Sequence, residues 1–142
     1  MTRITFLHGA GYRLQAAGTW LGQVAREGRR VLVYAPLERD LEHLDRLLWT
    51  QSATGFVPHC LDGTALATET PVVLAGTIEQ PGSCEFLLNL SDGIPPGFSS
   101  FEQLVEIVGS ADSDRIAGRE RYRFYRERGY PLDARDISGD AA

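Results

Sequence analysis

The sequence predicts a three-layer α/β/α sandwich with a mostly parallel, Rossmann-like central sheet. Residues 3–7 and 31–35 are short apolar runs, and the second is continuously apolar, as in strands that are covered on both faces. After each run, leucine, alanine and valine recur at the three- and four-residue spacing of a helix. Strands that alternate with helices in this way form parallel sheets joined by right-handed crossovers.

The first half of the chain gives these elements in order. The helix after residue 7 has an inner face formed by Leu14, Ala17, Leu21 and Val24. Gly28 offers a stop for this helix before the second strand. Pro36 can occupy the first turn of the next helix, where a missing N–H costs no helical hydrogen bond. The inner face of that helix is expected to consist of Leu37, Leu41, Leu44 and Leu48.

The second half alternates less regularly. Residues 51–70 have the composition of a loop, apart from a short strand expected around Phe56 and Val57. Two further strands are expected at residues 71–75 and 86–90 because both runs are apolar and bounded by turn residues.

Two helices are expected toward the end of the chain. Ser99 and Ser100 each precede a Glu or Gln by three residues, a capping-box pattern that predicts a helix through Val108. A last helix is expected over residues 114–128, because Gly129 and Pro131 follow as strong stop signals. Its inward-facing residues are expected to be Ile116 and Phe124.

Length and composition indicate one globular domain. The chain has 142 residues, of which 43% are hydrophobic and 23% charged, the usual balance of a folded domain. We expect this domain to span residues 1–132 and a small, polar, flexible tail to follow over residues 133–142. No apolar run near Met1 is long enough for a signal peptide or a membrane span, so we expect a cytoplasmic protein without membrane contact.

The sequence favours a protein without catalytic residues or cofactors. A turn with Gly9 and Gly11 follows the first strand, but Leu14 stands where a dinucleotide-binding fingerprint needs its third glycine. The chain contains no lysine, which excludes a P-loop and Schiff-base chemistry, and no serine lies in a G-x-S-x-G elbow. A small nucleotide-binding or hydrolase-like enzyme that uses the glycine turn remains the alternative from another class.

The cysteines and histidines do not predict a metal site. Cys60 and Cys84 lie in different segments without a C-x-x-C spacing, and isolated cytosolic cysteines are usually reduced and buried. His59 stands beside Cys60, but tetrahedral zinc needs four ligands, and the three histidines and two cysteines are scattered. We therefore expect no bound metal.

The last predicted helix carries the clearest functional signal. All fourteen basic residues are arginines, and six of them fall within residues 115–128, where only two acidic residues oppose them. The spacing of i, i+3, i+4 and i+7 places four residues on one helix face, namely Arg119, Tyr122, Arg123 and Arg126. Arginine binds carboxylates bidentately and a neighbouring ring offers an apolar wall, so this face fits an acidic peptide that ends in an apolar side chain.

Two other interpretations of this face stay open. Basic helix faces are often only solvated surface. Arginines interleaved with aromatic rings also bind single-stranded nucleic acid directly. The net charge of −5 weakens the nucleic-acid interpretation.

Several stretches of the chain resemble the chi subunit family of bacterial DNA polymerase III. One is LDRLLW at residues 44–49, followed by FVPH at residues 56–59. Another is RERYRFYR at residues 119–126, with Gly129 and Tyr130 after it. Residues 30–32 and 88–96 agree as well, so the resemblance extends over nearly the whole chain in the same order.

The resemblance implies a non-catalytic accessory of the replicative clamp loader, with an α/β fold similar to nucleotide-binding domains. Family members bind the acidic C-terminal tail of single-stranded DNA-binding protein, which ends in a phenylalanine carboxylate. The family's pocket for this tail maps to Val108, Arg119, Tyr122 and Arg123, and Arg126 continues the same basic face. Val108, expected at the end of the preceding helix, would line the floor beneath Tyr122. Lysine often occupies the position of Arg123 in the family, so the charge is kept and the donor geometry differs.

A second surface also follows from the resemblance. Family members contact the psi subunit, which links chi to the clamp loader, and some use the same surface for a helicase-like protein. This surface maps to Trp49, Phe56, Val57 and Pro58, where apolar side chains flank a polar loop. The alternative that Trp49 and Phe56 are merely core residues stays open. The resemblance thus implies an adaptor between two proteins, without direct DNA contact.

Overall fold

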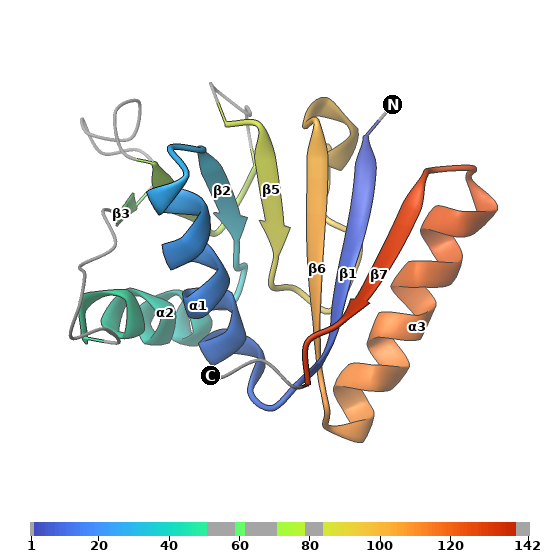
Figure 1. The fold of residues 1–142 in the computed structure, drawn as a ribbon, viewed down its shortest axis with the longest axis horizontal. Helices are drawn as coiled ribbons and strands as arrows, with labels where there is room; N and C mark the ends of the chain where they lie inside the picture. The colour runs from blue at the N-terminus through green and yellow to red at the C-terminus, as the bar shows by residue number, and fades with distance from the viewer. Residues whose placement is uncertain (1, 51–58, 62–70, 79–83, 139–142) are drawn as a thin grey trace.

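The chain folds into a parallel sheet with helices on both faces (Figure 1). The computed structural model describes residues 2–50, 59–61, 71–78 and 84–138. Within these ranges seven strands lie in the order β3-β4-β2-β5-β6-β1-β7, and every pairing is parallel. The predicted α/β/α sandwich with a mostly parallel sheet is confirmed.

The first half of the chain follows the predicted order of elements. These elements are β1 (Arg3–Ala10), α1 (Arg13–Arg26), β2 (Val31–Tyr34) and α2 (Glu38–Thr50). Leu44 and Leu48 are buried as predicted, and Leu41 packs partly buried against the same cluster. The prediction for Leu37 is wrong: its side chain is 47% exposed, because α2 begins after it.

The second half confirms the strands predicted at residues 71–75 and 86–90 and the last helix. Its elements are β3 (His59–Leu61), β4 (Val72–Ala75), β5 (Phe86–Asn89), the short 3₁₀ helix η1 (Phe98–Ser100), β6 (Gln103–Gly109), α3 (Asp112–Glu127) and β7 (Leu132–Asp136). The strand expected around Phe56 and Val57 lies outside the described residues. The turn before η1 ends at Gly97, whose φ of 72° is a left-handed conformation that glycine adopts at little cost.

The helix predicted to run through Val108 is wrong, because this segment forms the interior strand β6. β6 lies between β5 and β1, and all of its residues after Gln103 are buried. Val105 and Ile107 are β-branched and favour an extended backbone in a covered sheet. Burial between two neighbouring strands therefore overrides the local capping-box pattern.

The flexible tail expected from Asp133 onward is wrong for the residues up to Asp136. These residues belong to β7, which pairs with β1 from Leu132 opposite Ile4 to Asp136 opposite His8. β7 is an edge strand whose side chains are mostly exposed, so its sequence lacks the alternation of a half-buried strand. Backbone pairing with β1 holds it in place.

Two apolar clusters cover the two faces of the sheet. Successive side chains of a strand point to opposite faces, so Leu7 and Phe6 of β1 belong to different clusters. The cluster that contains Leu7 also contains the buried side chains of α1 and α2. The cluster that contains Phe6 includes Tyr125 of α3 and Phe98 of η1. α3 therefore covers the face opposite to α1 and α2.

α3 buries one narrow face, formed by Gly118, Arg121 and Tyr125. Phe124 is partly buried beside it, in agreement with the prediction. Ile116 was expected to face the core, but its side chain is 57% exposed because it lies on another side of the helix. None of the described helices is long and apolar enough to cross a membrane.

Candidate functional site

A buried polar network fixes α3 on the sheet. Glu106 of β6 is fully buried, and Arg121 Nε donates a hydrogen bond to its Oε1 over 2.9 Å. The Tyr125 hydroxyl donates to Oε2 over 2.6 Å, and the Asn89 amide donates to both oxygens over 2.9 and 3.1 Å. A buried charge is tolerated when it is paired and hydrogen-bonded in this way. The network therefore sets the rotation of α3, with Arg121 facing inward.

Burial dominates the electrostatics of this network. It raises the pKa of Glu106, against the opposing effects of Arg121, Tyr125 and Asn89. It also raises the pKa of Tyr125, and the Glu106 charge acts in the same direction. Tyr125 therefore stays protonated, and its hydroxyl donates a hydrogen bond to Glu106. Because its contacts are all internal, the network supports the helix and is not itself a ligand site.

A pocket with a volume of about 350 Å³ opens between α3 and the sheet, and we name it the α3 pocket. Its lining residues are Phe6 and His8 of β1, Val108 of β6, Arg115, Gly118, Arg119 and Tyr122 of α3, and Ala134 of β7. Three of the five residues predicted for the basic site, Val108, Arg119 and Tyr122, thus lie around one cavity.

Apolar side chains form the base of the α3 pocket. Val108 is 8% exposed and touches α3 at Gly118, where an added Cβ would lie 2.8 Å from Val108 Cγ2. The ring of Tyr122 meets the ring of Phe6 edge to face, with 5.2 Å between the centroids. Val108 reaches the pocket from strand β6 and not, as predicted, from the end of a helix.

Cationic side chains stand at the exposed side of the α3 pocket. Arg115 and Arg119 are both exposed, and the lining contains no acidic residue. Arg115 Nη1 lies 3.7 Å from Asp112 Oδ1, an exposed ion pair of a kind that contributes little rigidity. Guanidinium groups above an apolar base can hold an apolar side chain and a carboxylate side by side.

The other two predicted residues of the basic face lie outside this lining. Arg123 and Arg126 are exposed on α3 and extend the positive surface beyond the pocket. Two lining residues, Arg115 and His8, were not among the predicted site residues. Arg115 lies one helical turn before Arg119, so helical spacing was a signal that could have found it. His8 lines the pocket only because β1 passes beneath α3.

The second predicted surface is described only in part. Trp49, at the C-terminal end of α2, is 59% exposed, so in this chain it is a surface residue and not a core residue. Phe56, Val57 and Pro58 lie outside the described residues. α2 and α3 lie toward opposite ends of the sheet, as Figure 1 shows.

Arg13 occupies the carboxyl ends of β5 and β6, the edge at which α/β sheets commonly bind nucleotides. Its guanidinium donates to the backbone carbonyl groups of Asn89, Leu90, Ser91 and Ile107, over 2.8–3.3 Å. Burial is the main reason that the pKa of Arg13 is lowered, and the charge of Arg121 adds to this effect. These contacts engage the guanidinium within the fold, which disfavours an enzyme built on the glycine turn.

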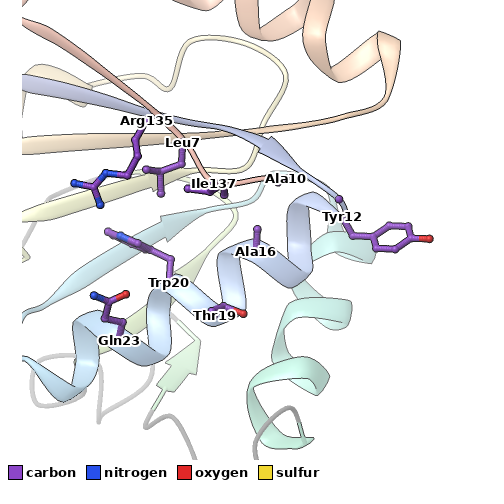
Figure 2. A pocket seen from close by; sticks show the side chains of 10 residues that line it. Leu7, Ala10, Tyr12, Ala16, Thr19, Trp20, Gln23, Arg135 and Ile137 are labelled. Atoms are coloured by element: carbon purple, nitrogen blue, oxygen red, sulfur yellow. The ribbon is translucent and has the colours of Figure 1, made fainter. Parts of the chain in front are cut away.

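Another pocket lies between α1 and strands β1 and β7, and Figure 2 shows it from close by. Leu7, Ala16 and Trp20 contribute apolar walls, and Arg135 is its charged lining residue. Asp133 lines the adjoining depression together with Arg135. An acidic ligand would therefore meet one arginine and a nearby carboxylate here. The α3 pocket, with two arginines and no acidic lining residue, fits such a ligand better.

Comparison with known proteins assigns the chain to a described group. A family model described as "DNA polymerase III chi subunit, HolC" matches residues 1–133. The DNA polymerase III subunit chi of Pseudomonas aeruginosa is 36% identical over 121 residues, which cover 84% of this chain and 83% of that protein. The protein of the same name from Haemophilus influenzae is 30% identical, and the match covers 86% of this chain and 82% of that protein. The one from Escherichia coli is 33% identical, and the match covers 76% of this chain and 74% of that protein.

Solved structures show the breadth of the fold. The C-terminal domain of S. cerevisiae Dbp5, solved bound to Gle1 and IP6, superposes with a TM-score of 0.58 at 5% identity. The superposition covers 96% of this chain and 90% of that domain. At this level of identity the likeness concerns the fold alone.

Proposed function

Since this chain belongs to the DNA polymerase III chi subunit family, a family of non-catalytic replisome subunits, we propose that it acts as an adaptor. Its α3 pocket captures the acidic C-terminal tail of single-stranded DNA-binding protein, and a second surface contacts psi and, through it, the clamp loader. The chain acts in the cytoplasm, where replication takes place, and contributes no catalytic group to it.

The observation that carries this proposal is the convergence of Val108, Arg119 and Tyr122 on one cavity. An aromatic side chain at the end of a peptide can pack between Val108 and the Tyr122 ring. The terminal carboxylate then lies within reach of Arg119. Acidic residues upstream can follow the positive surface that Arg123 and Arg126 continue along α3.

The contacts proposed for the α3 pocket correspond to micromolar binding. Burial of one apolar side chain contributes about 1.5–3 kcal/mol. Each hydrogen bond to a charged group contributes about 1.5–3 kcal/mol before ordering costs. Two or three such contacts approach the roughly 8 kcal/mol of a micromolar complex. Weak single contacts suffice for an adaptor, because many acidic tails on one coated DNA strand raise their effective concentration.

Calorimetric titration with an acidic peptide that ends in Pro-Phe tests the proposal. We expect saturable micromolar binding, and a loss of at least about tenfold in affinity with Arg119→Ala or without the terminal Phe, which corresponds to roughly 1.4 kcal/mol. Arg123→Ala and Arg126→Ala should weaken binding by only about two- to threefold, because these arginines lie outside the lining of the α3 pocket and would contribute as surface charges.

The matched control is Arg46→Ala, which removes an exposed arginine from α2, away from the α3 pocket. It should leave the affinity unchanged within about twofold, as expected of a distant surface residue. Equal losses of affinity with Arg46→Ala and Arg119→Ala would mean that the interaction is nonspecific charge attraction, and would overturn the proposal.

The contact with psi is proposed for the surface around Trp49, with Phe56, Val57 and Pro58 as its further members. Exposed tryptophan side chains are frequent anchors of protein interfaces, and Trp49 is 59% exposed. A helicase-like protein is the other partner that this surface could accept. Loss of binding to purified psi with Trp49→Ala, and retained binding with Arg119→Ala, is the expected result.

A further inference from the structure

Phe6 of β1 is a buried aromatic residue in the lining of the α3 pocket. Its ring meets two rings of α3. The ring centroids lie 5.2 Å apart for Phe6 and Tyr122, with an interplanar angle of 67°, and 6.0 Å apart for Phe6 and Tyr125, with an angle of 59°. Aromatic pairs favour such distances and tilted arrangements. Phe6 thus packs against one tyrosine of the pocket and one tyrosine of the buried polar network.

The two tyrosines are held in different ways. The Tyr125 hydroxyl donates a hydrogen bond to Glu106 over 2.6 Å. Within the part of the chain that the structure describes, the Tyr122 side chain makes no hydrogen bond, and its aromatic contact is the one with Phe6. Tyr122 packs partly buried against the apolar cluster that contains Phe6. Packing, and not a polar contact, therefore determines the orientation of the Tyr122 ring.

The place of Phe6 in the sheet makes it a firm support. β1 pairs with β6 on one side and with β7 on the other, and Phe6 lies opposite Glu106 and Ala134 in these two registers. The side chain of Phe6 is 3% exposed, so little of it is left for a ligand to touch. Phe6 therefore acts on a ligand through the ring of Tyr122.

A fixed Tyr122 ring distinguishes chain ends that are similarly apolar. An aromatic ligand side chain gains a ring–ring contact in addition to the burial of its area, whereas an aliphatic side chain gains the burial alone. The ring–ring contact needs a defined angle between the two planes. A Tyr122 ring without support would have to be ordered when the ligand binds, at a cost in conformational entropy.

We propose that Phe6 is a positioning residue of the α3 pocket, which holds the Tyr122 ring in the orientation that selects an aromatic chain end over an aliphatic one. The inference rests on the proposed function, since it concerns the same ligand at the same site. It adds that the pocket recognises the aromatic character of the last side chain, in addition to the carboxylate that Arg119 binds.

Calorimetric titration with two acidic peptides, identical except that one ends in Pro-Phe and the other in Pro-Leu, tests this inference. Phe6→Leu removes the ring and keeps an apolar side chain. Phe98→Leu is the matched control, because Phe98 belongs to the same cluster and its ring lies 5.3 Å from that of Tyr125, but it does not line the α3 pocket. Thermal unfolding of each variant verifies that the fold is retained.

Wild type and Phe98→Leu should bind the Phe peptide about fivefold more tightly than the Leu peptide, the size of effect expected of one aromatic contact. Phe6→Leu should bind the Phe peptide about fivefold more weakly than wild type does, and the Leu peptide with an affinity unchanged within about twofold. The preference for the aromatic end is then lost. A general loss of stability would weaken both peptides equally.

Substitutions of Tyr122 test the same inference without a change in the core. Tyr122→Phe keeps the ring and should keep the preference, whereas Tyr122→Leu should lose it. Once Tyr122 is leucine, Phe6→Leu should weaken binding of the Phe peptide by less than about twofold further, because Phe6 acts through the ring that is already absent.

Two results overturn the inference and leave the proposed function intact. One is an unchanged preference for the Phe peptide in Phe6→Leu or in Tyr122→Leu. The other is an equal loss of affinity with Phe6→Leu and Phe98→Leu. No binding of either peptide by wild type contradicts the proposed function itself.

Discussion

Glu106 and its partners determine how the arginine-rich helix meets the rest of the molecule. Arg121 belongs to the basic segment, yet it is 3% exposed and paired with Glu106 over 2.9 Å. Tyr125 adds the shortest hydrogen bond of the group, at 2.6 Å. Loss of one partner from a buried charge is costly, because the charge cannot recover its hydration.

Tyr125→Phe is therefore expected to destabilise the protein by about 1.5–3 kcal/mol, the contribution typical of a hydrogen bond to a charged group. Urea unfolding measures the change in the free energy of unfolding. The slope of this free energy against urea concentration should stay the same if the native state stays compact. Tyr12→Phe is the control, since Tyr12 is 78% exposed, and it should change stability by less than about 0.5 kcal/mol. Equal effects of the two substitutions would contradict the structural role of the network.

The turn between β1 and α1 depends on one of its two glycines. Gly9 has a φ of 80°, and an added Cβ would lie 2.8 Å from Asp136 Oδ1. Among the described residues, a Cβ added at Gly11 would have no heavy atom within 4 Å apart from its chain neighbours. We expect Gly9→Ala to lower the free energy of unfolding by about 1–2 kcal/mol, because L-residues rarely adopt this backbone conformation.

Gly11→Ala, the matched control, should change stability by less than about 0.5 kcal/mol. Chemical denaturation measures the free energy of unfolding of both variants. If the two substitutions are equally tolerated, the strain assigned to Gly9 is absent.

Local patterns in the sequence predict most of the elements, and the failures have identifiable causes. Apolar runs and helical spacing were sufficient for β1, β2, β4, β5, α1 and α2, because each of these buries its own apolar side chains. The last helix, α3, was predicted instead from the stop signals Gly129 and Pro131. β6 was mistaken for a helix because of the capping-box pattern at Ser99 and Ser100, and only the partners of Glu106 in the fold explain a charge within this apolar strand. β7 could not be predicted, because an exposed edge strand is defined by its neighbour and not by its own sequence.

Only part of the candidate site could be predicted from the sequence. Arg119 and Tyr122 follow from spacing within one helix, and the family resemblance adds Val108. His8 could not be found, because β1 and α3 are distant in the sequence and meet only in the folded sheet. Arg121 could not be separated from its neighbours for a related reason, since the carboxylate that holds it lies on a strand outside the helix.

The whole molecule places its two proposed surfaces on different parts of the sheet. α3 packs over β6 on one face, whereas α2 packs on the other face toward β4, at the opposite end of the strand order. An adaptor needs this separation, since one partner must not displace the other.

We expect Trp49→Ala to leave the affinity for the Pro-Phe peptide unchanged within about twofold, because distant sites contribute independently. Fluorescence anisotropy with a labelled peptide measures this affinity. A large loss of affinity would show that the two surfaces are coupled or shared.

The most direct test of the adaptor role uses single-stranded DNA-binding protein on its DNA. Surface-immobilised binding kinetics measure how this chain binds to three surfaces. These are a single strand coated with the intact protein, a single strand coated with a version that lacks the acidic tail, and the naked strand. We expect binding to the first surface alone, and its loss with Arg119→Ala. Binding that survives removal of the acidic tail, or equally strong binding to naked DNA that falls steeply with salt, would contradict the adaptor role and favour direct DNA binding through α3.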